Sequence, residues 1–192
     1  MKIQKAGSCF VGEVSGIDLT RPLSKDEIAK IHAGMDEYAV LIFHDQRFTD
    51  EQQLSFSRSL GELESYFGAS LRTPNEYRLP TTFADVSNLD QNNQPFAYDD
   101  RRRLFAIGNR LWHSDSSFKV TPAKYSILHA REIPSKGGNT EFADMRAAYE
   151  SFDQETKELI KGLVCEHSQM YSRRLLGFTD FSEEEQTRFQ PV

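Results

Sequence analysis

The N-terminal part of the chain begins with alternating apolar and polar positions and continues with a helical pattern. Residues 1–20 alternate around three glycines, which predicts two short strands joined by turns. Ser24, followed three residues later by Glu27, forms a capping box, so a helix is expected to begin there. One face of this helix is apolar and is expected to pack on a core. It is formed by Ile28, Ile31 and Met35.

A short apolar run and a second capping pattern predict the next two elements. Residues 40–43 are continuously apolar, which is typical of a buried strand. Thr49 and Gln52 then predict the start of a helix that ends at Gly61.

Residues 62–108 are the least regular stretch, interrupted by prolines and asparagines, with one strand-like piece near residues 82–89. Long loops near a site often act as lids or selectivity elements. Three consecutive arginines, Arg101, Arg102 and Arg103, lie near its end. They are interpreted either as a solvated turn or as a basic rim that attracts an anionic substrate, and the sequence leaves both interpretations open.

Strands are expected again further on, and the chain then becomes helical. Residues 104–107 and 123–130 are predicted to be strands, and another short strand is expected to begin at Thr140 after a glycine turn. One helix is expected over residues 144–152. Asp153 is expected to cap the next one, which would carry Leu159, Leu163 and Val164 in register. Ser182 is expected to cap a last, acidic helix.

Composition limits the class of protein. A chain of 192 residues is the size of one domain and can bury a sizeable core. A hydrophobic content of 38% with 14 Phe and 7 Tyr suits a β-rich globular protein. The net charge of −6 argues against nucleic-acid binding and against a polybasic membrane surface. An anionic ligand would therefore need a local group of cations or backbone N–H groups.

The cysteines and the lengths of the apolar runs bear on the cellular compartment. Cys9 and Cys165 lie far apart and match no metal or redox spacing, so reduced thiols are expected. Neither a signal peptide nor an apolar run of membrane-spanning length is visible in the sequence. A cytoplasmic protein without a membrane partner is expected.

The clearest chemical signal is a histidine and an aspartate two residues apart, His113 and Asp115. In an extended strand, residues i and i+2 point to the same face roughly 6.5–7 Å apart, so both side chains can reach one metal ion. Together with a second histidine they would form the 2-His-1-carboxylate triad of non-haem Fe(II) sites. A bare His-x-Asp pair is more often a strand end where the Asp bonds its neighbours beside a half-buried His.

The surrounding sequence resembles a known family. The segments L-W-H-S-D-S-S-F at 111–118, G-G-N-T-E-F-A-D-M-R-A-A-Y at 137–149 and S-R-R-L-L-G-F-T-D-F-S at 172–182 resemble the taurine/2,4-dichlorophenoxyacetate dioxygenases, and most of all their phenoxyacetate-cleaving branch. The resemblance runs from G-E-V-S-G-I-D-L at 12–19 to the last residue. It implies an α+β, mainly β fold, a double-stranded β-helix (the cupin-like jelly roll) with flanking helices. It also implies Fe(II) as cofactor, with 2-oxoglutarate and O2 as cosubstrates.

The resemblance assigns roles to four residues. His113 and Asp115 match the first two metal ligands and are the catalytic residues. Thr140 matches a threonine that bonds the distal carboxylate of the cosubstrate, although a threonine after a glycine turn is also an ordinary strand former. Asn109 matches an asparagine lining the substrate and cosubstrate pocket, and the alternative interpretation is a turn residue beside Gly108. Trp112 and Phe118 are expected in the core or in a pocket wall.

One departure from the family pattern bears on the metal site. The second metal-binding histidine of the family and the arginine that holds the cosubstrate carboxylate have no counterpart up to residue 192. His167 matches a position that is not a ligand in the family, and His129, His32 and His44 are expected to be structural. Residues 1–192 are therefore expected to form a single dioxygenase domain that lacks its C-terminal portion.

Three functions follow from these observations. The first is a dioxygenase that hydroxylates a small anionic substrate, an aryloxyacetate ether cleaved to a phenol and glyoxylate, with succinate and CO2 as coproducts. The second is a taurine, alkylsulfonate or sulfate-ester dioxygenase, and the third is a non-catalytic jelly-roll scaffold. Aromatic residues between positions 62 and 118 favour an aryl substrate: Tyr66, Phe67, Phe83, Phe96, Tyr98 and Phe105. A homo-oligomer is expected.

Overall fold

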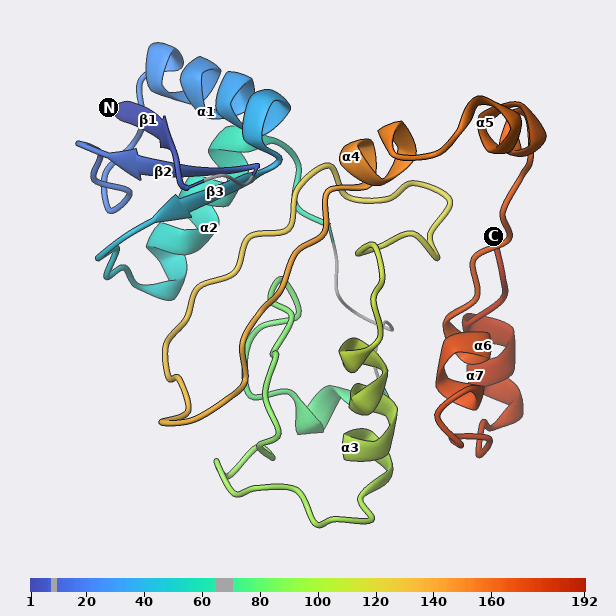
Figure 1. The fold of residues 1–192 in the computed structure, drawn as a ribbon. Helices are drawn as coiled ribbons and strands as arrows, with labels where there is room; N and C mark the ends of the chain where they lie inside the picture. The colour runs from blue at the N-terminus through green and yellow to red at the C-terminus, as the bar shows by residue number, and fades with distance from the viewer. Residues whose placement is uncertain (8–9, 65–70) are drawn as a thin grey trace. The chain divides into compact units, whose positions relative to one another are not determined.

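The chain forms two units, each assembled from two separate stretches of sequence. A computed structural model describes residues 1–7, 10–64 and 71–192 (Figure 1). Unit 1 comprises Met1–Leu63 and Ile127–Leu163, and unit 2 comprises Glu64–Ser126 and Val164–Val192. Cys9, Tyr66 and Phe67 lie outside the described residues.

Unit 1 contains a three-stranded sheet in the order β1-β2-β3. Strands β1 (Lys2–Lys5) and β2 (Val11–Ser15) pair antiparallel, and β2 pairs in parallel with β3 (Val40–Phe43). A parallel pair needs a crossover connection, which the intervening helix provides. The three strands expected in the N-terminal part are therefore confirmed.

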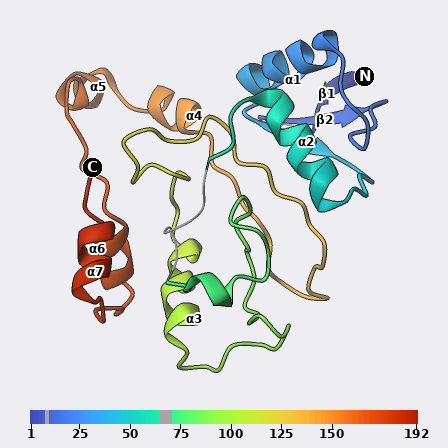
Figure 2. The ribbon, with the colours of Figure 1, turned by 180° about the vertical axis from the view of Figure 1, so that it is seen from behind.

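Two capped helices pack beside this sheet in both views (Figures 1 and 2). Helix α1 (Lys25–Tyr38) begins with the predicted capping box of Ser24 and Glu27. Helix α2 (Asp50–Leu60) begins with a second capping box, formed by Thr49 and Gln52, and ends at Gly61 as predicted. Both starts are set by hydrogen bonds within four residues, which is why the sequence alone could place them.

The core of unit 1 is built from the inner faces of these elements. Ile31 of the expected apolar stripe is 2% exposed and packs with Leu19 and Phe56. Gly34 lets α1 approach the sheet closely, because a Cβ there would stand 2.6 Å from Cδ1 of Ile3. Ile127 also packs against this core, which ties the second stretch of unit 1 to the first.

The second stretch of unit 1 carries α4 (Met145–Glu150), capped by Asp144, and α5 (Gln154–Ile160), capped by Asp153. Both predicted starts are confirmed. The predicted continuation of α5 through Leu163 and Val164 is wrong, because the helix ends at Ile160 and Gly162 adopts a φ of 81°. A glycine in the left-handed region is a common helix stop.

Unit 2 is helical around an aromatic core. It contains η1 (Pro74–Glu76), α3 (Arg101–Ala106), η2 (Ile107–Arg110), α6 (Gln169–Arg174) and α7 (Glu183–Arg188). Helix α7 starts at the predicted cap, whereas the sequence pattern did not indicate α6. The core joins α3, α6 and the end of α7. Its buried side chains are Phe105, Met170, Phe178, Phe181 and Phe189.

The strand predicted over residues 104–107 is wrong, because this segment belongs to α3 and η2. A short apolar run does not by itself distinguish a strand from a buried helix. Here Asp100 accepts a hydrogen bond from Arg102 N at 2.8 Å and caps a helix. Local capping therefore decided the conformation.

The other expected strands lack hydrogen-bonded neighbours. Burial alternates residue by residue from position 123 to position 130, as in a strand, but no ladder joins this segment to another described one. The strand expected at Thr140 is likewise not formed, and residues 82–89 contribute only an isolated bridge between Leu89 and Pro95. The described residues thus show one small sheet with helices, and the jelly roll stays a prediction.

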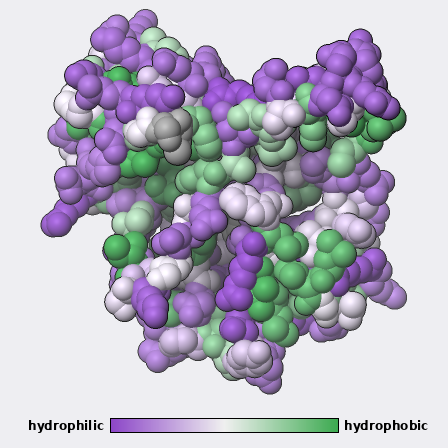
Figure 3. All heavy atoms as spheres, viewed as in Figure 1, coloured by the Kyte–Doolittle hydropathy of each residue, from purple (hydrophilic) through white to green (hydrophobic). Residues whose placement is uncertain are grey.

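Large apolar side chains also lie on the surface, visible as green among purple in Figure 3. Among them, Val164 is 95% exposed, Val120 89%, Tyr98 83% and Ile133 79%. Among the described residues, no helix is both long and apolar enough to cross a membrane.

Candidate metal and cosubstrate site

The structure brings His113 and Asp115 together in unit 2. They follow η2 in a segment that has no regular secondary structure at His113 and forms a turn at Asp115, so the strand geometry expected for them is wrong. The turn is marked by Ser116, whose φ is 56°. His113 Nε2 lies 3.2 Å from Asp115 Oδ1, and both side chains are about half exposed.

Each of the two side chains is held by a second contact on its far side. His113 Nδ1 lies 2.6 Å from the carbonyl oxygen of Leu111. Because a carbonyl only accepts, Nδ1 carries the proton, and Nε2 is then the ring nitrogen that could bind a metal. Ser126 Oγ donates to Asp115 Oδ2 at 2.6 Å, which leaves Oδ1 facing the histidine.

This arrangement fits part of a metal site. Two ligand atoms bound at a right angle, each about 2.1 Å from a metal, stand about 3 Å apart. The separation of 3.2 Å between Nε2 and Oδ1 agrees with that geometry. The backbone carbonyl behind the imidazole and the hydroxyl behind the carboxylate are the outer partners that metal ligands normally have. No group of three or more His, Cys, Asp or Glu in the described part of the chain could hold a metal.

Thr140 belongs to unit 1, whereas His113, Asp115 and Asn109 belong to unit 2. It is exposed and follows Gly137 and Gly138, which have φ values of 72° and 73°. Both glycines thus adopt the left-handed φ that the expected turn needs, but the bend lies at residues 135–136, and the turn at Gly137 and Gly138 stays a prediction. The contact of Thr140 with a cosubstrate stays a prediction.

Asn109 lies in η2, four residues before His113, and is exposed. Its Oδ1 accepts a hydrogen bond of 3.2 Å from Nη2 of Arg173 in α6. The sequence analysis did not single out Arg173, because nothing in the run S-R-R shows which arginine faces η2.

The arginine run is not a solvated turn, since it forms the first turn of α3. Arg101 pairs with Glu185 and Asp180, and Arg102 pairs with Glu76 at 2.6 Å and Asp100 at 2.7 Å. Hydrogen bonding to Arg101 lowers the pKa of Glu185. The charges of Arg101 and Arg102 are thus matched within unit 2.

A second arginine cluster, which sequence reasoning missed, holds the irregular loop. Asp85 bonds Arg72 at 2.9 Å and Arg78 at 2.8 Å, and its side chain is 7% exposed. Burial by itself would raise the pKa of Asp85, but the hydrogen bonds from Arg78 and Arg72 hold it at about 2. Arg72 and Arg102 also lie over the ring of Phe96, at 5.6 and 4.5 Å.

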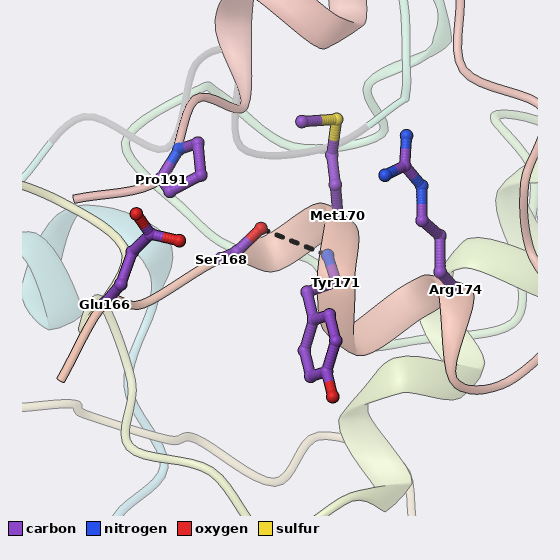
Figure 4. A pocket seen from close by; sticks show the side chains of 6 residues that line it. All are labelled: Glu166, Ser168, Met170, Tyr171, Arg174 and Pro191. Carbon is purple, nitrogen blue, oxygen red and sulfur yellow. Dashed lines mark hydrogen bonds between the residues drawn. The ribbon is translucent and has the colours of Figure 1, made fainter.

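One of the surface cavities in unit 2 is lined by none of the predicted site residues. It measures about 400 Å³ and is shown in Figure 4, where Ser168 accepts a hydrogen bond from the backbone of Tyr171. Its lining consists of Glu166, Ser168, Met170, Tyr171, Arg174 and Pro191. A cavity of about 240 Å³ lies beside α3 and includes Leu104 and Phe178. Neither cavity is lined by His113, Asp115, Asn109 or Thr140.

Comparison with known proteins places these features in a family. The family described as Taurine catabolism dioxygenase TauD, TfdA family matches residues 2–192. The chain is 38% identical over 183 residues to the alpha-ketoglutarate-dependent 2,4-dichlorophenoxyacetate dioxygenase of Burkholderia sp. (strain RASC), covering 95% of this chain and 61% of that protein. It is 30% identical over 177 residues to the (S)-phenoxypropionate/alpha-ketoglutarate-dioxygenase of Delftia acidovorans, covering 92% and 58%.

A solved structure is also similar. The crystal structure of AAD-2 in complex with Mn(II) and N-oxalylglycine matches with a TM-score of 0.96 at 52% identity, covering all of this chain and 66% of that one. The chain spans about three fifths of the length of the curated relatives that it matches.

Proposed function

We propose, from the premise that this chain belongs to the TauD, TfdA family of taurine catabolism dioxygenases, that it acts as an Fe(II)- and 2-oxoglutarate-dependent dioxygenase on aryloxyalkanoates. The observation that carries the proposal is the paired His113 and Asp115. Their Nε2 and Oδ1 atoms stand 3.2 Å apart, in a chain 38% identical to a 2,4-dichlorophenoxyacetate dioxygenase.

The proposed substrate is a small anionic aryl ether. The relatives reported above are named for 2,4-dichlorophenoxyacetate and (S)-phenoxypropionate, which share an aryl ether oxygen next to a carbon bearing a carboxylate. Hydroxylation of an aryloxyacetate at that carbon gives a hemiacetal that separates into a phenol and glyoxylate. The cosubstrate leaves as succinate and CO2.

The metal would be held by His113 Nε2 and Asp115 Oδ1. Bound Fe(II) supplies the activation of dioxygen that oxidises the C–H bond. The chain's own residues orient it: the Leu111 carbonyl fixes the imidazole tautomer, and Ser126 turns Asp115 so that one oxygen is available.

Two polar side chains, Thr140 and Asn109, are proposed to bind the cosubstrate. N-oxalylglycine, found with Mn(II) in the similar crystal structure, has the shape and the two carboxylates of 2-oxoglutarate. The hydroxyl of Thr140 can donate to such a carboxylate in a charge-assisted hydrogen bond. Asn109 is proposed to contact the substrate and the cosubstrate. The chain carries a net charge of −6, so local donors of this kind are needed to hold two anions.

The proposal extends to the fold. Residues 1–192 are proposed to be part of one dioxygenase domain with a cupin-like jelly roll. The alternating burial of residues 123–130 supports this, since it is the pattern of a strand with one face toward a core and the other toward solvent. A homo-oligomer is proposed as the assembled form.

Oxygen consumption by the native protein tests the function. Fe(II) and 2-oxoglutarate are supplied with phenoxyacetate, with taurine, or with no substrate, and each assay is repeated with His113→Ala and with His167→Ala as the matched control. We expect phenoxyacetate-dependent uptake that is lost in the first variant and kept in the second, with phenol and glyoxylate as products. Uptake with taurine alone would favour the sulfonate function, and no uptake with any substrate would favour a scaffold.

A further inference from the structure

We propose that Arg173 of α6 is a positioning residue for the metal-site segment, which we define as residues 108–115. The proposal deepens the proposed function and rests on it. The guanidinium of Arg173 holds the turn from which His113 and Asp115 emerge, and a glycine at position 108 makes room for it.

Three hydrogen bonds fix the guanidinium between α6 and the end of α3. Arg173 Nε donates to the carbonyl oxygen of Phe105 at 3.1 Å, and Nη1 donates to Ser172 Oγ at 2.9 Å. Nη2 donates to Asn109 Oδ1 at 3.2 Å. The guanidinium also lies 4.8 Å from the centre of the Phe105 ring, which is itself 5% exposed. A planar group with donors on several edges suits these directions, and an ammonium group cannot reach all of them.

Gly108 provides independent support. It is buried, and a Cβ at this position would stand 2.5 Å from Arg173 Nη1 and overlap the guanidinium carbon. Gly108 does not have a positive φ, so its backbone conformation does not require glycine. A Cβ at position 108 would therefore displace the guanidinium of Arg173 for spatial reasons.

A continuous path of hydrogen bonds leads from this contact to the metal-binding atoms. The carbonyl oxygen of Gly108 accepts a hydrogen bond of 3.1 Å from Leu111 N, which closes η2. The carbonyl oxygen of Leu111 then holds Nδ1 of His113 at 2.6 Å. Displacing Gly108 therefore moves the group that orients the imidazole.

The same contact determines what Asn109 offers to a ligand. An arginine side chain has donors and no acceptor, so the atom of Asn109 that faces Arg173 is Oδ1. Nδ2 is left as the outward group of the exposed side chain, and it is a donor. Arg173 thus presents Asn109 as a donor suited to an anionic or carbonyl ligand.

The test uses Arg173→Ala and Gly108→Ala in the native protein, with Arg174→Ala as the matched control. Arg174 is on the same helix and carries the same charge, but its guanidinium lies over Phe181. Trp112 is the single tryptophan of the chain and lies inside the metal-site segment, so its fluorescence anisotropy reports the mobility of that segment without any ligand. Calorimetry measures the affinity for Mn(II) in the presence of N-oxalylglycine.

We expect both variants to lower the Trp112 anisotropy and to weaken Mn(II) binding about 10- to 100-fold, as is typical when an outer partner of a metal ligand is removed. Arg173→Lys keeps the positive charge but loses the planar guanidinium and its several donors. It should therefore recover only part of the Mn(II) affinity. Adding Gly108→Ala to Arg173→Ala should cost little more, because the added Cβ then occupies the vacated space.

The outcomes separate this inference from the proposed function. If Arg173→Ala and Gly108→Ala match Arg174→Ala in anisotropy and affinity, the inference is wrong even if Mn(II) binds. If the wild-type protein binds no Mn(II), the proposed metal site is wrong, and the Trp112 anisotropy still decides whether Arg173 holds the segment. Should Arg173→Ala unfold, Gly108→Ala and Arg173→Lys carry the test.

Discussion

At the scale of single residues, the candidate metal site depends on atoms that are not ligands. Asp115 has two carboxylate oxygens, and only one of them faces His113. The other accepts the hydroxyl of Ser126 at 2.6 Å. Without that hydroxyl the carboxylate is free to rotate, so the ligand oxygen is no longer pre-oriented.

Substituting Ser126 is therefore expected to weaken the metal site without unfolding the protein. Ser126→Ala should reduce Mn(II) affinity about 10-fold, because outer partners typically contribute at that level. The hydrogen bond is exposed, so its loss should change the free energy of unfolding by no more than about 1 kcal/mol. Ser151→Ala, which removes an exposed bond to the Ala148 carbonyl, is the control. Equal Mn(II) affinities for the two variants would contradict this role.

Asp85 should make the stability of unit 2 depend on pH at the acidic end. Its folded pKa of about 2 lies below the ordinary value of 3.8, so its stabilising effect is complete above about pH 4 and is lost as the pH falls towards 2. Asp85→Asn should remove this part of the acid dependence. It should also destabilise the fold by about 3 kcal/mol at neutral pH, because two partly buried guanidinium groups lose their carboxylate.

Urea unfolding at pH 7 and at pH 3 checks both effects, with Asp99→Asn at an exposed position as the control. If Asp85→Asn loses no more stability than Asp99→Asn at either pH, this role of Asp85 is wrong.

At the scale of elements, the sequence correctly predicted the helix starts that are fixed by hydrogen bonds between residues close in sequence. Ser24 with Glu27, Thr49 with Gln52, Asp153 and Ser182 all cap helices where expected, because each cap closes within a few residues. The apolar side chains of residues 104–107 suit either a strand or a helix, and the cap at Asp100 decides in favour of the helix.

Pairing between distant segments could not be predicted in the same way. Residues 123–130 have the alternation of a strand, but a ladder depends on another segment lying alongside. The candidate site shows the same limit. The approach of His113 to Asp115 could be anticipated from their spacing, whereas the bonds from Ser126 and Arg173 span 11 and 64 residues.

Helix α7 offers a test of capping against ion pairing. Ser182 Oγ accepts a hydrogen bond from Glu185 N, while the buried Glu185 carboxylate accepts one from Ser182 N and also pairs with Arg101. Ser182→Ala should cost about 1 kcal/mol of unfolding free energy, as cap removal usually does. Glu185→Ala should cost more, about 3 kcal/mol, because Arg101 also loses a buried partner.

Denaturant unfolding measures both, and Glu184→Ala on the exposed side of α7 is the control. A smaller loss for Glu185→Ala than for Ser182→Ala would show that the ion pair does not stabilise the helix.

At the scale of the whole molecule, stability is divided between two hydrophobic cores. Phe56 belongs to the core of unit 1, whereas Phe181 belongs to the aromatic core of unit 2. Truncating a buried phenylalanine to alanine typically costs about 3–5 kcal/mol. We expect that loss to appear first as local opening of the unit that contains the residue.

Hydrogen exchange can locate this opening. Phe56→Ala should speed amide exchange in β2, β3 and α1, and Phe181→Ala should speed it in α3 and α6. Leu128→Ala, at a side chain that is 60% exposed, should do neither. Uniformly faster exchange over both units after either truncation would mean that the chain opens as one cooperative body.

The bond between the Leu111 carbonyl and His113 has a consequence for how the site tolerates genetic change. The orienting acceptor belongs to the main chain, so no codon change at position 111 deletes it, and many side chains there should be neutral to metal binding. The partner of Asp115 is a side-chain hydroxyl, which a single nucleotide change can remove. The orientation of His113 is thus insensitive to most substitutions at position 111. The orientation of Asp115 can be altered by substituting Ser126, both in natural selection and in directed evolution.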